Sequence, residues 1–245
     1  MITSVKNEKV KAWKKLQQRK ERKQTNTFLI EGLHLIEEAW KSEWRIKEII
    51  VLDFEVLPEW VQDFAVEEVS DNVFQYISQT QTPQGIAAVV EIKRMDNNKG
   101  NHVLLIDAVQ DPGNLGTMIR TADAAGFDGI VLGEGTVDLF NDKVVRATQG
   151  SLFHLPIYDA KLTDEIVALK EAGFTIWATA LEDAEIYSDV SVANKMAIIM
   201  GNEGAGVNRE LIALADTIVT IPIYGKAESL NVSIASAILM YYVKS

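Results

Sequence analysis

Cysteine is absent from this sequence of 245 residues, and histidine occurs only three times, as His34, His102 and His154. The lack of thiols excludes disulfides, thiolate metal ligands and cysteine nucleophiles. The histidines do not have the spacing of metal ligands, so we expect no metal cofactor. Long apolar runs are missing too, and the polar, basic start Met1–Lys23 does not resemble a secretory signal. We therefore expect a cytoplasmic protein without membrane segments.

Net positive charge is also lacking, since the chain carries a formal net charge of −11 at pH 7. Nucleic-acid binding relies on Lys and Arg side chains that neutralise phosphates, so this total argues against such a partner. The distribution argues the other way, because residues 1–24 contain nine basic and two acidic residues, which leaves −18 for the rest. A basic arm can contact nucleic acid, but a merely solvated basic helix has the same pattern. Both interpretations stay open.

Hydrophobic residues make up 47% of the chain, enough for a sizeable core. Residues Val5–Gln24 have the spacing of one helix that packs a narrow apolar stripe. Short strand and helix patterns then alternate from residue 27 to residue 93, and the polar stretch Arg94–Asn101 has the composition of a linker. We therefore expect a basic arm (residues 1–24), a small α/β domain (residues 25–95) and a second domain (residues 102–245).

In the second domain, strand-like apolar runs alternate with helical patterns. This order implies an α/β fold with a parallel sheet and helices on both faces. Ligands of such sheets bind beyond the carboxyl ends of the strands. The loops after Asp107, Thr179, Met200 and Ile223 are therefore the expected positions of a site.

The first segment whose residues could bind a ligand or take part in catalysis is Asp107–Gly126, which directly follows an apolar strand. Pro112 and Gly113 break the strand pattern, and a glycine-containing turn before a helix can hold an anion at the helix N-terminus. Asn114 and Arg120 could then bracket a phosphate or a ribose. Asparagine and glycine are also common turn residues, and Arg120 could be a surface charge, so this segment alone is a weak signal.

The second segment, Ile-Ile-Met-Gly-Asn-Glu-Gly-Ala-Gly at residues 198–206, has three glycines within six residues after a strand. Such a turn can wrap closely around a flat ligand and offer it backbone N–H and C=O groups. The glycines follow the order G-x-x-G-x-G instead of the dinucleotide fingerprint G-x-G-x-x-G. This order disfavours a nicotinamide-dependent oxidoreductase.

The third segment, Ile221–Tyr242, begins as a short strand pattern and ends as a helix that is apolar on nearly all sides. A helix of this kind is tightly packed or forms an interface. Ser229 and Asn231 are good residues for a helix start, so simple N-capping is one explanation for them.

In this order and at these distances, the three segments resemble the signature motifs of the SpoU (TrmH-like) branch of the SPOUT RNA methyltransferases, over residues 102–245. Five residues match the core of those motifs: Asn114, Arg120, Glu203, Ser229 and Asn231. Residues 25–93, which start with Phe-Leu-Ile-Glu-Gly and end with Thr-Pro-Gln-Gly-Ile-Ala, resemble the ribosomal-protein-like substrate-binding domain that members often carry.

The resemblance implies a C-terminal trefoil knot, in which the last strand and helix thread through an earlier loop. General topology rules would not have suggested a knot. It also implies a homodimer through the knot region, which would bury the apolar surface of residues 234–242. S-adenosylmethionine would bind bent inside the knot, its adenine held by backbone groups. The resemblance assigns cofactor binding to these residues: Thr179, Met200, Gly201, Asn202, Gly204, Ile221, Leu230, Asn231 and Val232.

The implied activity is methyl transfer from S-adenosylmethionine to a ribose 2'-hydroxyl of RNA. Arg120 would lie at the catalytic centre, oriented with the ribose by Asn114 and Glu203. Ser229 and Asn231 would shape the pocket beside the methyl donor. Because an arginine side chain stays charged in proteins, we expect it to bind the target phosphate and stabilise alkoxide character, and the general base stays open.

Ribosomal RNA is favoured over transfer RNA as the substrate, because the first domain resembles a ribosomal-protein fold. The alternatives are a catalytically silent RNA-binding or dimerisation protein of the same fold, a transfer-RNA 2'-O-methyltransferase, and a methyltransferase that acts on a base or a protein.

Overall fold

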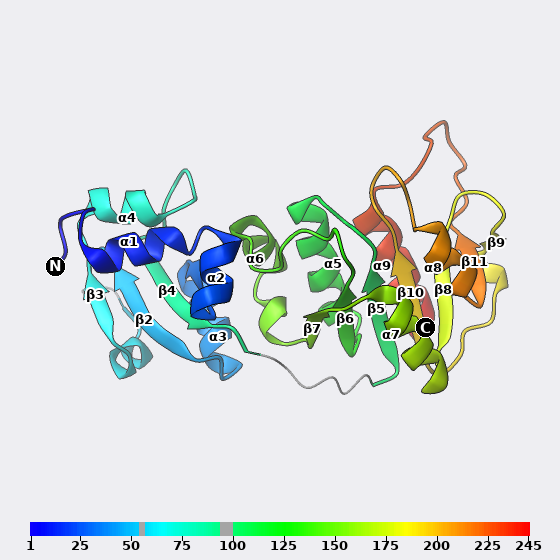
Figure 1. The fold of residues 1–245 in the computed structure, drawn as a ribbon, viewed down its shortest axis with the longest axis horizontal. Coiled ribbons are helices and arrows are strands. Elements are labelled where there is room, and N and C mark those ends of the chain that lie inside the picture. The colour runs from blue at the N-terminus through cyan, green and yellow to red at the C-terminus, as the bar shows by residue number, and fades with distance from the viewer. Residues whose placement is uncertain (54–56, 94–99) are drawn as a thin grey trace. The chain divides into compact units, whose positions relative to one another are not determined.

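The computed structural model of the chain describes residues 1–53, 57–93 and 100–245, which form two compact units (Figure 1). The first unit contains Met1–Lys93 and Asp138–Phe153, and the second contains residues 100–137 and 154–245. Most of the predicted linker, residues 94–99, lies outside the described residues. Among the described residues, no helix is both long and apolar enough to cross a membrane.

The first unit is built on a four-stranded sheet in the order β1-β4-β2-β3. Strand β4 pairs antiparallel with β1 and β2, and β2 pairs parallel with β3. The expected alternation of short strands and helices is present, and β3 is an additional strand that the sequence did not indicate. The elements are α1 (Glu8–Lys15), α2 (Arg19–Thr25), β1 (Thr27–Glu31), α3 (Leu33–Lys41), β2 (Ile46–Val51), the 3-10 helix η1 (Glu59–Asp63), β3 (Val66–Glu68), α4 (Asp71–Ile77) and β4 (Ile86–Glu91).

The basic N-terminal segment is two helices instead of the single helix predicted. Val10, Trp13 and Leu16 are buried and pack into the core of the first unit beside α4. The chain turns after Leu16, where the buried Arg22 side chain folds back and donates a hydrogen bond of 2.7 Å from Nη1 to the Leu16 carbonyl oxygen. Arg22 also forms an ion pair with Asp138. The segment is therefore part of a folded unit.

The stretch Asp138–Phe153, which contains α6 (Asp142–Thr148) and the 3-10 helix η2 (Ser151–Phe153), packs in the first unit. The sequence-based division places it with residues 102–245. Aromatic packing explains the difference: the ring centroids of Phe28 and Phe140 are 4.6 Å apart, and those of Trp44 and Phe153 are 5.2 Å apart. The Trp44 indole N–H also donates to the Phe153 carbonyl oxygen over 3.1 Å.

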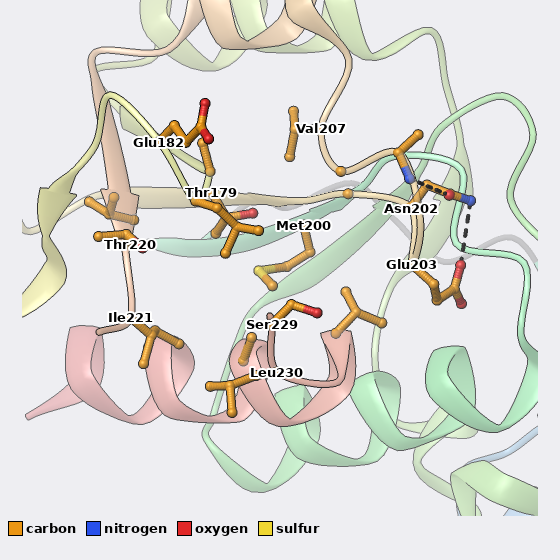
Figure 2. A pocket seen from close by; sticks show the side chains of 18 of the residues that line it. Thr179, Glu182, Met200, Asn202, Glu203, Val207, Thr220, Ile221, Ser229 and Leu230 are labelled. Carbon is orange, nitrogen blue, oxygen red and sulfur yellow. Dashed lines mark hydrogen bonds between the residues drawn. The ribbon is translucent and has the colours of Figure 1, made fainter. Parts of the chain in front are cut away.

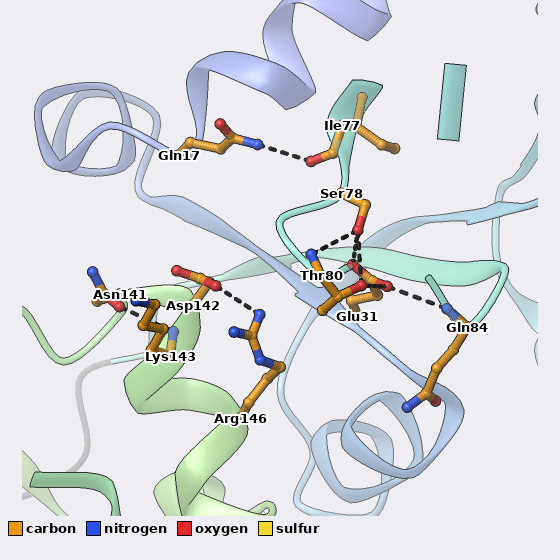
Figure 3. A network of polar contacts seen from close by, with 10 residues as sticks. All are labelled: Gln17, Glu31, Ile77, Ser78, Thr80, Gln84, Asn141, Asp142, Lys143 and Arg146. Atoms are coloured by element: carbon orange, nitrogen blue, oxygen red, sulfur yellow. Dashed lines mark hydrogen bonds and ion pairs between the residues drawn. The ribbon is translucent and has the colours of Figure 1, made fainter. Parts of the chain in front are cut away.

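Glu31, at the end of β1, holds the loop that precedes β4 (Figure 3). Its carboxylate accepts hydrogen bonds of 2.7 Å from the Ser78 and Thr80 hydroxyls and one of 3.2 Å from the Gln84 N–H. A Cβ on Gly32 would lie 2.7 Å from Gln84 Oε1, and Gly32 has a φ of +105°. The Phe-Leu-Ile-Glu-Gly and Thr-Pro-Gln-Gly-Ile-Ala segments are thus neighbours in the structure.

The second unit contains a seven-stranded sheet in the order β7-β6-β5-β10-β8-β11-β9, in which every described pair is parallel. Its elements are β5 (His102–Ile106), α5 (Pro112–Ala124), β6 (Gly129–Leu132), β7 (Ile157–Asp159), α7 (Leu162–Glu171), β8 (Thr175–Thr179), β9 (Glu185–Ile186), the 3-10 helix η3 (Tyr187–Asp189), β10 (Met196–Met200), α8 (Arg209–Leu214), β11 (Thr217–Thr220) and α9 (Val232–Lys244). This confirms the expected parallel α/β sheet.

Both faces of this sheet are covered. On one face, α7 and α8 pack with alternate strand residues such as Leu105, Ile176 and Ile199. The intervening residues Leu104 and Ile198 are also fully buried, because α9 packs on β10 and against α5 on the other face. Near-continuous apolar strands are what a doubly covered parallel sheet requires.

The third segment, Ile221–Tyr242, does not begin with the short strand that the sequence predicts. Strand β11 ends at Thr220, so residues 221–231 form an irregular connection to α9 instead of beginning as a strand. Pro222 accounts for this difference, because it has no backbone N–H to donate to a neighbouring strand. Helix α9 follows as expected, and Leu239, Met240 and Val243 are among its buried residues.

Candidate functional site

A cavity of about 650 Å³ lies at the carboxyl ends of β8, β10 and β11 (Figure 2). Its walls come from the segments that follow those strands, as the general rule for parallel sheets predicts. All nine residues expected at the cofactor line it: Thr179, Met200, Gly201, Asn202, Gly204, Ile221, Leu230, Asn231 and Val232. Two residues expected in catalysis, Glu203 and Ser229, line it as well.

The turn after β10 is closed on itself and forms one wall of the cavity. The backbone N–H groups of Asn202 and Gly206 each donate to the other residue's carbonyl oxygen over 3.0 Å. The Asn202 side-chain oxygen accepts two further hydrogen bonds of 3.0 Å, from the N–H groups of Gly204 and Ala205. A Cβ on Gly201 would lie 2.2 Å from the Gly206 carbonyl carbon. The turn therefore needs glycine at position 201, because its two sides touch there.

A chain of side-chain hydrogen bonds joins the three motifs. The Asn231 amide nitrogen donates to Asn114 Oδ1 over 2.9 Å. The Asn114 amide nitrogen in turn donates to Glu203 Oε1 over 3.1 Å. Asn114 lies in the first turn of α5, Glu203 in the turn after β10, and Asn231 at the start of α9. Segments that are remote in the sequence thus meet at one edge of the cavity.

Glu203 is held as a carboxylate by several donors. The N–H groups of Asp111 and Gln110 donate to its two oxygens over 3.0 and 3.2 Å, in addition to the Asn114 amide. Burial raises the pKa of the Glu203 carboxyl, but the hydrogen bonds from Asp111, Asn114 and Gln110 together outweigh it and lower the pKa below its usual value. The site therefore contains a fixed negative charge beside the start of α5.

We expect Glu203 to make folding stability depend on pH. Because its pKa is lowered in the folded chain, the carboxylate stabilises the fold fully above the ordinary value of 4.5, and this contribution is lost as the pH falls through the folded pKa. Glu203→Gln should therefore be less stable than wild type near neutral pH, and the difference should shrink below about pH 4. Urea unfolding of both proteins across this range measures it, and a pH-independent difference would contradict the assignment.

Asn231 has two structural roles. Its side-chain oxygen accepts hydrogen bonds of 2.9 Å from the Ser233 N–H and 2.6 Å from the Ser233 hydroxyl, so it is the N-cap of α9. Its side-chain nitrogen is the donor to Asn114. The cap is therefore present, and the predicted role of Asn231 in the site is compatible with it, because the two use different atoms of one amide group.

Arg120 is one of the two predicted site residues that do not line the cavity, the other being Asn114. It is exposed on α5, on the same stripe as the exposed residues Gly113 and Thr117. Within the described part of the chain, its side chain forms no hydrogen bond or ion pair, so its five N–H donors are available to a ligand. Asn114 does not line the cavity either, but it bonds to two residues that do.

Several lining residues were not singled out from the sequence. Leu181 and Glu182 follow Thr179 in the loop after β8, and Arg209 is the first residue of α8. The position after a strand end was the available signal for the first two, since that loop was among those expected to hold the site. No feature of the sequence indicated Arg209, because it reaches the cavity only through the path of the turn at residues 201–207, which leads into α8.

Comparison with known proteins gives matches over most of the chain. A profile of the SpoU rRNA Methylase family matches residues 101–241, and a profile of the MRM3-like substrate binding domain matches residues 7–88. The chain is 49% identical over 244 residues to the 23S rRNA (guanosine(2553)-2'-O)-methyltransferase RlmP of Bacillus subtilis, which covers 99% of this chain and 98% of that protein.

Two solved structures with bound AdoMet have the same fold. An rRNA methyltransferase from Sinorhizobium meliloti superposes with a TM-score of 0.90 at 35% identity, covering 99% of this chain and 96% of that one. The SpoU methyltransferase AviRb from Streptomyces viridochromogenes superposes with a TM-score of 0.87 at 26% identity, covering 97% of each chain.

Proposed function

The chain belongs to the SpoU rRNA methylase family, and we propose that it methylates a guanosine ribose of 23S ribosomal RNA. It is an S-adenosylmethionine-dependent RNA methyltransferase that acts on a ribose 2'-hydroxyl. The observation that carries the choice of 23S RNA is the 49% identity, over nearly the full length, to a protein whose name gives that target. A ribosomal substrate in turn favours a cytoplasmic location.

The cavity fits S-adenosylmethionine in size and in the groups that surround it. Its volume of about 650 Å³ is typical of small-molecule sites. The backbone of residues 201–206 offers N–H and C=O groups, and Met200, Ile221 and Leu230 offer apolar surface for a flat ring. We propose that these groups hold the adenine and ribose. When bound, the cofactor supplies a methyl group activated by a positively charged sulfur.

The hydrogen-bonded residues at the cavity edge have a positioning role in this proposal. Asn114 cannot rotate freely, because its amide is held between the Glu203 carboxylate and the Asn231 amide. Correct alignment of two reactants can lower an activation barrier by about 7–11 kcal/mol. Residues that fix the geometry at the cavity edge would therefore have a large effect on the rate of methyl transfer. Ser229 and Asn231 would shape the place where the hydroxyl meets the methyl group. Arg120 would bind the target phosphate.

Transfer of labelled methyl groups tests the proposed function. Purified protein is incubated with tritiated S-adenosylmethionine and unmodified 23S RNA, and the RNA is digested to nucleosides. Label in 2'-O-methylguanosine supports the proposal. Label in a methylated base would contradict it, and so would label in transfer RNA but not in 23S RNA when both are offered. Absence of label from both RNAs would favour a silent RNA-binding protein of the same fold.

We further propose a homodimer formed through α9 and a knotted C-terminal region. Ile234 and Tyr241 of α9 are 51% and 56% exposed, which is apolar surface that a second copy would cover. The knot would involve the connection at residues 221–231, whose two ends border the cavity before α9 packs against α5. Sedimentation velocity of wild type and of Ile234→Glu tests the dimer, since a buried charge at the interface should give monomers.

The N-terminal basic segment is a candidate contact for RNA phosphates. Lys6, Lys15, Lys20 and Lys23 are exposed, and their side chains form no hydrogen bond or salt bridge within the described residues. If all four contact phosphates, changing them to Gln should reduce the salt dependence of RNA binding by a slope of about 0.7 × 4, near 3. Fluorescence anisotropy with labelled RNA at several salt concentrations measures the slope.

The substitutions are preferable to deleting residues 1–24, because the deletion would remove Val10 and Trp13 from the core. Lys9 and Lys11 provide a matched control, since they already pair with Glu67 and Glu8. Changing these two to Gln should alter the slope less than changing two of the unpaired lysines. A slope that is the same for the fourfold variant and wild type would assign the segment to packing alone.

A further inference from the structure

The connection between β11 and α9 carries an unusual side chain at its tip. Tyr224 is 95% exposed, more than any other large hydrophobic residue among those described. Figure 1 shows this loop projecting from the second unit. Within the described part of the chain, residues 222–230 form no hydrogen bonds, so the loop is held only at its ends.

Tyr224 makes no contribution to folding that would explain an aromatic residue at this position. Its ring is in water, so burying it cannot stabilise the chain, and it has no aromatic partner among the described residues. Gly225 beside it would tolerate a Cβ in open space, so the loop is not tightly constrained there. An aromatic side chain displayed in this way is instead suited to contact another molecule.

The ends of the loop place Tyr224 beside the reaction site. Ile221 and Ile223 line the cavity before the tip, and Ser229 to Val232 line it after the tip. Asn231, at the end of the loop, belongs to the hydrogen-bonded chain with Asn114 and Glu203. A molecule whose reacting atom enters this cavity therefore has its neighbouring groups close to the loop.

We propose that Tyr224 is a stacking platform for an unpaired nucleobase of the RNA, next to the methylated ribose, and that Lys226 contacts an adjacent phosphate. This inference rests on the proposed function and adds to it a specificity-determining residue. Proteins recognise single-stranded RNA by stacking its bases on aromatic side chains and by pairing its phosphates with cations. Tyr224 and the exposed Lys226 present both groups within three residues.

The composition of the loop favours RNA over a protein partner. A protein interface surrounds its aromatic anchor with other apolar residues that exclude water. The four residues that follow Tyr224 are Gly225, Lys226, Ala227 and Glu228, all of them exposed and none of them large and apolar, whereas the preceding Ile223 is half-buried and lines the cavity. A single ring beside a cation matches a base and its phosphate better than it matches an apolar protein surface.

The test compares Tyr224→Ala, Tyr224→Phe and wild type in methyl transfer to unmodified 23S RNA. Loss of a stacking ring should raise the KM for RNA by about tenfold to a hundredfold in Tyr224→Ala, while Tyr224→Phe stays close to wild type because the ring is kept. The Kd for S-adenosylmethionine, measured by calorimetry, should not change in either variant. Val167→Ala, which truncates an exposed apolar side chain on α7, is the control.

An unchanged KM for RNA in Tyr224→Ala would overturn the proposal, and so would equal damage in Tyr224→Phe, which would assign the effect to the hydroxyl. Conversion of Tyr224→Ala to a monomer in sedimentation velocity would also overturn it in favour of a subunit contact. If wild type methylates no RNA, the proposed function fails separately. Anisotropy of labelled RNA would still compare binding by wild type and Tyr224→Ala in that case.

Discussion

Arg120→Ala should depress methyl transfer by roughly a hundredfold to a thousandfold, the size of effect seen when a donor that stabilises developing negative charge is removed. The guanidinium lies on α5, the helix whose first turn contains Asn114, and it has no ion-pair partner among the described residues. Its charge and donors are therefore free for a phosphate and for alkoxide character on the ribose oxygen. Single-turnover rates with tritiated donor measure the effect.

Two further measurements separate this role from a structural one. Because Arg120 is exposed, the free energy of unfolding should change by no more than about 0.5 kcal/mol in Arg120→Ala. The Kd for S-adenosylmethionine should also stay near that of wild type, since Arg120 does not line the cavity. Arg120→Lys keeps the charge without the planar fork of donors, so it should restore only part of the rate. Full activity of Arg120→Ala would reject the role.

Gly201→Ala should impair both folding stability and cofactor binding. The added Cβ would lie 2.2 Å from the Gly206 carbonyl carbon and from the Val207 nitrogen. These are backbone atoms, so the clash can be relieved only by moving the turn that forms a wall of the cavity. Overpacking of this kind costs about 1–3 kcal/mol or more. The displaced N–H and C=O groups should also weaken S-adenosylmethionine binding by at least about tenfold, the equivalent of one lost hydrogen bond.

Gly204→Ala is the matched control for the stability effect. It adds the same methyl group to the same turn, but its Cβ would meet only Asn202 Oδ1, at an ordinary distance of 3.7 Å. Its free energy of unfolding should stay within about 0.5 kcal/mol of wild type. Urea unfolding gives the stabilities, and calorimetry with S-adenosylmethionine gives the affinity of Gly201→Ala. Wild-type values for Gly201→Ala would show that the turn is not closed as described.

The structure also shows that polar residues from all three motifs are hydrogen-bonded to one another. Asn114, Glu203 and Asn231 each have a local role that the sequence suggests, at a helix start or in a turn. Their side chains nevertheless bond to one another across 89 and 117 residues of sequence. Changing one of them leaves the donors or acceptors of the next one unsatisfied, so their effects on rate are expected to be non-additive.

The alternation of apolar runs along the sequence predicts the parallel α/β sheet of the second unit, and it places the expected site in the loops after its strands. Apolar runs of strand length, such as residues 196–200, alternate with helical patterns, and strands that are buried on both faces must be apolar throughout. The glycines at 201, 204 and 206 predicted a closely wrapped turn, and that turn is present. These features follow from local periodicity and local backbone requirements, which a sequence displays directly.

Which distant residues meet becomes apparent only from the packing within each folded unit. This packing divided the basic segment at Leu16, placed Asp138–Phe153 in the first unit, and left Arg120 outside the cavity that Glu203 and Asn231 line. The physical reason is that a contact such as Asn231 to Asn114 depends on how whole helices and strands pack. Packing depends on the summed shape of many side chains, and no local pattern of residues records it.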